Sequence, residues 1–163
     1  MKKGRHIQFY TDNGWEGDLY DPKMGIKEVA QNMRKYVKEK YPDCKFSIRI
    51  QRYAGGQSMT IALMRAPFHA FDQSIDPEIY PHRDRGYAQL SIYRGLGVYE
   101  NPHGPDGYNN GSILTREAWD MLNDVIKQAN RYNYDDSDGM IDYFSTKFYL
   151  HAEIGSWDKP FER

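Results

Sequence analysis

The sequence predicts an α+β fold in which two amphipathic helices pack on one face of an antiparallel β-sheet. Apolar residues recur at helical spacing over residues 26–40 and again over 115–132. Four further stretches alternate apolar and polar residues, as half-buried strands do; they cover residues 45–53, 58–64, 87–93 and 148–155. The predicted order is helix, strand, strand, strand, helix, strand, preceded by an N-terminal hairpin.

The first predicted helix has an apolar face and a mainly basic face. The apolar face consists of Ile26, Val29, Ala30, Met33 and Val37. The opposite stripe consists of Lys27, Gln31, Arg34 and Lys38. Pro42 ends the helix, because proline has no amide hydrogen and restricts the residue before it. A stripe of this kind is typical of a solvated face, and its charge also suits contact with phosphates.

The segment 54–57, Ala-Gly-Gly-Gln, raises the question of a phosphate-binding loop. A phosphate loop needs a helix after its glycines, because the helix N-terminus supplies amides and positive potential. Here the alternating segment 58–64 follows, which indicates a strand. The glycines are therefore predicted to form the turn of a β-hairpin.

The second predicted helix begins after Thr115, a residue type favoured as an N-cap. Leu114 and Trp119 stand at the positions of a hydrophobic staple. Near the N-terminus, Ile7 and Phe9 alternate with polar residues and are followed by Asp-Asn-Gly at 12–14. This pattern predicts a short hairpin, or a strand with a turn, within residues 5–20.

The 163 residues suit one domain, 1–163, with long loops at about 65–86 and 94–114. No apolar stretch reaches the length of a membrane span, and the N-terminus lacks the apolar run of a signal peptide. We therefore expect a soluble, cytoplasmic protein. Cys44 is the only cysteine, so an intramolecular disulfide is excluded.

The formal net charge is −1, but the charge is unevenly distributed. Residues 23–53 contain nine basic and three acidic residues, whereas residues 134–163 contain three basic and seven acidic residues. Such polarity can steer a charged partner towards the molecule, although charged surface residues are also common without any such role.

The sequence carries no strong catalytic or metal-binding motif. His82 with Asp84, or His69 with Asp72, has the composition of a base with an orienting carboxylate, but no nucleophile motif accompanies either pair. Residues 134–145 fail an EF-hand pattern at both ends, and the histidines lack zinc spacing. We expect no metal, no cofactor and no catalytic residue, and lean against an enzyme.

A double-stranded-RNA-binding domain also runs helix, three strands, helix. Such domains place a cluster of lysines at the start of the second helix. Here residues 115–118 are Thr-Arg-Glu-Ala, with one basic and one acidic residue, which argues against this type of domain.

The stretch GIKEVAQNMRKYVKEKYPDCKFSIRIQRYAGGQSMTIAL resembles the core of a large polyvalent protein-associated domain family of phages and mobile genetic elements. The later stretch DYFSTKFYLHAEIGSWDKPF resembles the ending of related proteins. The resemblance covers roughly 25–64 and 115–161. It departs from the common pattern at 64–67, where Met-Arg-Ala-Pro replaces a tryptophan and a Gly-Pro.

This resemblance implies a non-enzymatic binding protein of a phage or mobile element, most concretely an anti-defence inhibitor of a CRISPR or restriction nuclease. The expected partner is a host defence protein or nucleoprotein complex. The alternatives are a nucleic-acid-binding accessory domain that uses the basic first helix, and a small enzyme with loop histidines.

Two surfaces of opposite charge are candidates for partner binding. The acidic one comprises Asp135, Asp136, Asp138 and Asp142 together with Tyr134. The basic one comprises Lys27, Arg34, Lys38 and Arg49. We favour the acidic surface, because its charges are predicted to lie on a turn that projects and because tyrosine rings beside it could anchor a contact.

Overall fold

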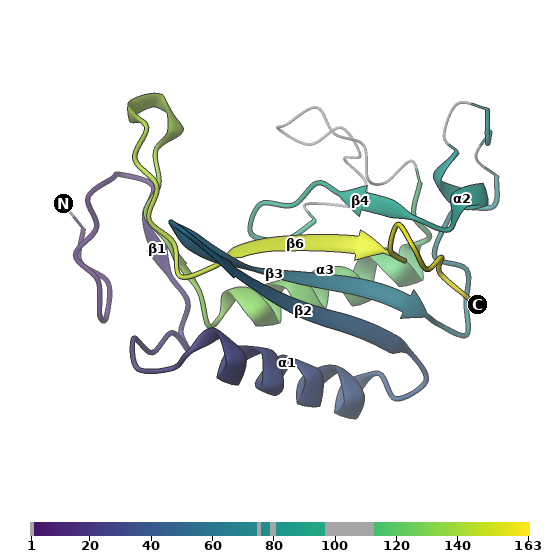
Figure 1. The fold of residues 1–163 in the computed structure, drawn as a ribbon, viewed down its shortest axis with the longest axis horizontal. Coiled ribbons are helices and arrows are strands. Elements are labelled where there is room, and N and C mark those ends of the chain that lie inside the picture. The colour runs from purple at the N-terminus through teal and green to yellow at the C-terminus, as the bar shows by residue number, and fades with distance from the viewer. Residues whose placement is uncertain (1, 75, 79–80, 97–112) are drawn as a thin grey trace.

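The computed structural model describes residues 2–74, 76–78, 81–96 and 113–163, and it has the predicted α+β architecture (Figure 1). The elements, in chain order, are β1 (Trp15–Glu16), α1 (Ile26–Lys40), β2 (Lys45–Tyr53), β3 (Gly56–Arg65), α2 (His82–Arg85), β4 (Ala88–Leu90), α3 (Arg116–Asn130), β5 (Tyr134–Asp135), the 3-10 helix η2 (Gly139–Ile141) and β6 (Tyr149–Ile154). The predicted order of two long helices and four strands is confirmed. No helix in the described part of the chain has the length and apolar composition needed to cross a membrane.

The main sheet is mixed, with strand order β2-β3-β6-β4. Strand β3 pairs with β2 in antiparallel orientation, and β4 pairs with β6 in the same way. The two central strands, β3 and β6, run parallel, so the expectation of a sheet that is antiparallel throughout was wrong. Alternation of apolar residues indicates a strand but not its direction, and the chain passes through β4 and α3 before it returns beside β3.

The first hairpin of the sheet confirms the reading of the double glycine as a turn. Tyr53 pairs with Gly56, so only residues 54 and 55 lie between the strands, and β3 begins two residues earlier than predicted. Gly55 has a φ of 89°, a value that side-chain-bearing residues rarely adopt. The chain therefore continues into a strand, without the helix that a phosphate loop would need.

Helix α1 packs on β2 through the face that the sequence predicts. Its apolar residues Ile26, Val29, Ala30, Met33 and Val37 are all buried. They form one cluster with Ile48, Met59 and Ile61 of the sheet and with Val125 of α3. Burial of this stripe, rather than helix propensity alone, stabilises the helix.

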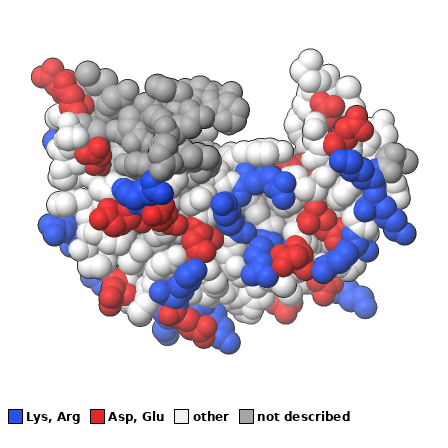
Figure 2. Space-filling model, turned by 180° about the vertical axis from the view of Figure 1, so that it is seen from behind, with Lys and Arg blue, Asp and Glu red and all other residues white. Residues whose placement is uncertain are grey.

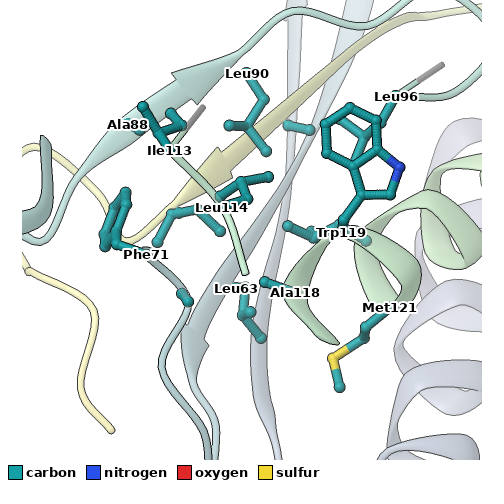
Figure 3. Close-up of a cluster of buried hydrophobic side chains, with 14 of the residues drawn as sticks. Leu63, Phe71, Ala88, Leu90, Leu96, Ile113, Leu114, Ala118, Trp119 and Met121 are labelled. Carbon is teal, nitrogen blue, oxygen red and sulfur yellow. The ribbon is translucent and has the colours of Figure 1, made fainter. Parts of the chain in front are cut away.

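Helix α3 covers the neighbouring part of the same sheet face. The hydroxyl of Thr115 accepts a hydrogen bond from the amide of Ala118, which confirms the predicted N-cap. Around Trp119 and Leu114, a second buried cluster joins the helix to β3, β4 and loop residue Phe71 (Figure 3). The loops on either side of β4 are thus anchored to the core at Phe71, Leu96 and Ile113. Most of the predicted loop 94–114 lies outside the described residues.

The N-terminal segment differs from the predicted hairpin. The turn lies at residues 4–7, where Gly4 donates to the carbonyl of Ile7 and Lys3 bridges to Gln8. The residues after Asp-Asn-Gly instead form β1, which pairs with β5 more than a hundred residues later. A turn signal shows where the chain bends but not which segment it then meets.

Candidate partner-binding site

Residues 135–146 form a narrow ribbon that projects beyond the sheet, and we call them the projecting ribbon (Figure 1). Its two arms are joined by backbone hydrogen bonds from Asp136 to Ser145 (2.8 Å) and from Asp138 to Tyr143 (2.7 Å), with a return bond from Tyr143 to Asp138 (3.0 Å). The 3-10 helix η2 closes the end. The prediction that the acidic segment is a turn that can project is therefore met by its backbone arrangement.

The tip of the projecting ribbon exposes large apolar side chains. Met140 is 93% exposed, Ile141 is 58% exposed and Phe144 is 60% exposed. Asp138 caps η2 by accepting from the amide of Met140, and Asp142 has the left-handed φ of 54° that closes the turn. Seen from behind, the projection at the upper right has an uncharged end with acidic groups below it (Figure 2). Exposed apolar groups gathered at one place are typical of an interaction surface.

A tyrosine pair extends this surface along the side of the ribbon. The rings of Tyr10 and Tyr143 lie 4.7 Å apart between centroids, and Tyr10 is 59% exposed. Tyr10 is held there by its amide, which donates to the Asp136 carboxylate at 2.5 Å. The aromatic surface beside the ribbon therefore includes Tyr10, which lies 126 positions before Asp136 in the chain.

Asp136 is a buried structural residue rather than a partner-binding one. It is 2% exposed, and its carboxylate also accepts from the amide of Thr11 (2.8 Å) and from its hydroxyl (2.6 Å). Burial acts to raise the pKa of Asp136, but these hydrogen bonds lower it below the ordinary value. Its place in the predicted acidic surface was wrong, because sequence cannot distinguish it from the aspartates beside it.

The other members of the predicted acidic surface differ in position. Tyr134 is half-buried at the base of the ribbon, where its ring meets Tyr20 at 5.1 Å and its hydroxyl lies 3.1 Å from that of Ser145. Asp135 is half-buried in β5, whereas Asp142 is exposed. The structure therefore brings Asp138 and Asp142 next to the apolar tip and leaves Tyr134 as support. That these residues bind a partner stays a prediction.

The predicted basic surface is divided between two faces of the molecule. Lys27 and Lys38 are exposed on α1, but Arg34 donates to the carbonyl of Ile48 at 2.7 Å and so ties the helix to β2. Arg49 belongs to the sheet face opposite the helices and forms a 3.0 Å ion pair with Glu153. Basic and acidic groups are interleaved over the face in Figure 2. The four residues do not form one continuous site.

Residues 24–89 match the family model of large polyvalent protein associated domain 29. This segment is similar to that family. The resemblance over residues 25–64 is confirmed, and the match also includes the loop that follows, up to β4. The resemblance over 115–161 lies outside the matched segment. Comparison with curated proteins and with solved structures gave no significant match.

The family segment, residues 24–89, contains α1, β2, β3, α2 and the first two residues of β4 but none of the projecting ribbon. The basic residues of α1 and β2 therefore lie within the family segment, whereas the acidic and apolar groups of the ribbon lie in the rest of the chain. Nothing in the match assigns an activity or a ligand to either.

The carboxylates of the two predicted base and carboxylate pairs, Asp72 and Asp84, have other close neighbours. Asp72 accepts from the amide and hydroxyl of Ser74, at 2.9 and 2.7 Å, so its carboxylate is engaged locally rather than with His69. Asp84 lies 3.5 Å from Arg83 in α2. In the described part of the chain, no three residues among His, Cys, Asp and Glu are grouped to hold a metal ion.

A polar cluster that no sequence pattern predicts joins α1 to α3. Asp124 accepts hydrogen bonds from the hydroxyls of Tyr36 (2.9 Å) and Tyr41 (2.6 Å) and lies 3.0 Å from the ammonium of Lys40. Burial acts to raise the pKa of Asp124, but these contacts lower it overall. The partners lie more than 80 residues apart in sequence, so no local pattern could reveal them.

Proposed function

We propose that the protein is a non-enzymatic binding protein that contacts a protein partner through the tip of the projecting ribbon. The exposure of Met140, Ile141 and Phe144 carries this proposal. Each side chain leaves most of its apolar surface in water, and removing such surface from water contributes about 25 cal/mol per Å². Three adjacent side chains on a projecting support can enter a pocket of a partner as anchors.

The charge beside the tip supports a partner with a basic rim. Asp138 and Asp142 flank the apolar residues, so complementary cations would accelerate encounter and fix orientation. A nucleic-acid-binding channel offers such a rim around its entrance. In the expected setting of a phage or mobile element, this chemistry supports an inhibitor of a host defence nuclease of the CRISPR or restriction type.

The experiment is affinity capture from a host lysate with the full chain and a variant of the tip. Met140→Ser combined with Phe144→Ser removes two anchors while leaving the fold intact, because both side chains are exposed. Trp157→Ser is the matched control, since Trp157 is 82% exposed and follows β6, whereas the ribbon precedes it. We expect one protein or nucleoprotein complex to be captured by the wild type and the control but lost by the tip variant.

Capture of the same proteins by the tip variant and the wild type would overturn the proposal, as would the absence of any specific capture. A second measurement addresses charge. Asp138→Asn with Asp142→Asn keeps the cap and tolerates the left-handed backbone, because asparagine suits both positions. We expect slower association with the captured partner and a weaker dependence on salt.

A further inference from the structure

A cleft of about 370 Å³ lies between the N-terminal strand and the C-terminal half of α3. Its lining residues come from three segments of the chain; they are Trp15, Glu16, Gly17, Asp18, Arg94, Lys127, Asn130 and Arg131. Clefts that hold small ligands commonly measure about 300–1,000 Å³. The cleft is therefore large enough for a small molecule, and it is separate from the tip of the projecting ribbon.

The walls of the cleft are fixed by backbone contacts. The amide of Gly17 donates to the carbonyl of Asn133, and that of Leu19 donates to the carbonyl of Arg131, each at 2.8 Å. A Cβ atom at Gly17 would lie 2.2 Å from the Arg131 carbonyl oxygen, so only glycine permits this approach. On the other side, Asn130 donates to the carbonyl of Arg94 at 3.2 Å. The site is thus largely formed before any ligand enters.

The two carboxylates of the cleft are already engaged. Asp18 forms two 2.9 Å hydrogen bonds with the guanidinium of Arg131. The side chain of Glu16 is only 5% exposed and accepts from the amide (3.0 Å) of His6, with the His6 ring nitrogen at 2.8 Å. Glu16 also lies 3.9 Å from the guanidinium of Arg5, so each carboxylate has a cationic neighbour other than Arg94 and Lys127.

Arg94 and Lys127 are the cations that remain. The guanidinium carbon of Arg94 lies 4.6 Å from the centroid of the Trp15 ring. Within the described ranges, neither Arg94 nor Lys127 forms an ion pair with a carboxylate. The cleft thus contains two positive charges without a carboxylate partner among the described residues. One of them, the guanidinium of Arg94, is held in place by the Trp15 ring.

We propose that this cleft binds the phosphate group of a small phosphate monoester, with Arg94 and Lys127 contacting its oxygens. A planar guanidinium matches two phosphate oxygens at once, and lysine adds a compact charge. A phosphate monoester carries close to two negative charges at neutral pH, which matches the two cations in number. A nucleoside monophosphate and a sugar phosphate both offer this group.

The test is isothermal titration calorimetry of the full chain with AMP, ribose 5-phosphate, inorganic phosphate and adenosine. We expect the phosphate-bearing compounds to bind and adenosine not to bind. Tighter binding of AMP than of ribose 5-phosphate would identify a nucleotide, and equal binding would identify a monoester selected by its phosphate; both results support the proposal. Absence of binding by every compound at millimolar concentration would overturn it.

Variants locate the binding within the cleft. We expect Arg94→Gln and Lys127→Gln each to raise the Kd about tenfold, which corresponds to about 1.4 kcal/mol at 25 °C. Lys159→Gln is the matched control on an exposed lysine beyond β6, and its Kd should stay within about twofold of wild type. Lys127 is exposed, so its variant tests the proposal even if Arg94→Gln alters folding. An unchanged Kd in Lys127→Gln would place the anion elsewhere and refute the site.

Discussion

Replacing Asp136 by alanine should release the N-terminal segment from the projecting ribbon. The substitution removes three hydrogen bonds to a carboxylate that is 2% exposed, and it leaves the amides of Tyr10 and Thr11 without their acceptor. A hydrogen bond contributes about 1 kcal/mol net, and more when one partner is charged. We therefore expect the free energy of unfolding to fall by about 2–4 kcal/mol.

Urea denaturation followed by circular dichroism measures this loss, and amide hydrogen exchange at Thr11 shows where it arises. Asp135→Ala is the matched control, because Asp135 is the adjacent aspartate and its half-buried side chain lies in β5. We expect Asp135→Ala to change stability by less than about 1 kcal/mol. Equal stability of the two variants, with Thr11 protected in both, would refute the assigned role of Asp136.

The same carboxylate predicts a dependence of stability on pH. The pKa of Asp136 is lowered in the folded protein, so its contribution is present above the unfolded value of about 3.8 and is lost as the pH falls through the folded value. The stability difference between wild type and Asp136→Ala should therefore be constant near neutral pH and shrink below about pH 4. A difference that instead grew in acid would contradict the sign of this shift.

Three further substitutions test contacts elsewhere in the fold. Asp124→Asn should lower the free energy of unfolding by about 1–2 kcal/mol, because it weakens the cluster between α1 and α3; thermal denaturation checks this, and an unchanged Tm would count against it. Gly17→Ala should lower the free energy of unfolding by about 1–3 kcal/mol, because the added Cβ would meet the Arg131 carbonyl. Gly139→Ala is the control: its Cβ would enter open space, so thermal denaturation should show a nearly unchanged Tm. Leu122→Ala should cost about 2–5 kcal/mol in urea denaturation, because Leu122 is fully buried, and a loss below 1 kcal/mol would show that the core there is not close-packed.

The helices and most strands could be predicted because their signals are local. The five apolar residues that define α1 lie within twelve consecutive positions, and their burial follows from helical spacing alone. The direction of β6 could not be predicted, because its alternation fits a parallel or an antiparallel neighbour equally well. The central position of β3 did have a sequence signal. Ala62 and Met64 are buried as well as Ile61 and Leu63, so both faces of the strand are covered there, and this agrees with the continuous nonpolar stretch IALM.

The candidate site was predicted only in part. The acidic composition of the ribbon was visible, but the burial of Asp136 depends on residues 10 and 11, which no local pattern connects to it. The apolar tip was missed even though Met140, Ile141 and Phe144 stand within an otherwise polar turn. The available signal was the presence of large apolar residues beside glycine and aspartate in a predicted turn. A turn at the surface cannot bury large apolar side chains, so they are expected to be exposed.

The parallel pairing of β3 with β6 has a consequence for biosynthesis. Strand β3 ends at Arg65, whereas β6, its parallel neighbour, begins only at Tyr149. Strand β4 cannot take the place of β6 beside β3, because among the described strands it pairs with β6 alone. At about 5–20 residues per second, the ribosome needs roughly 4–17 s to synthesise the intervening segment. Throughout that interval, the nascent chain carries an apolar strand with one open edge, which is a template for mispairing with other chains. Nascent-chain crosslinking should therefore find general chaperones on this strand until Ile154 has left the ribosome exit tunnel.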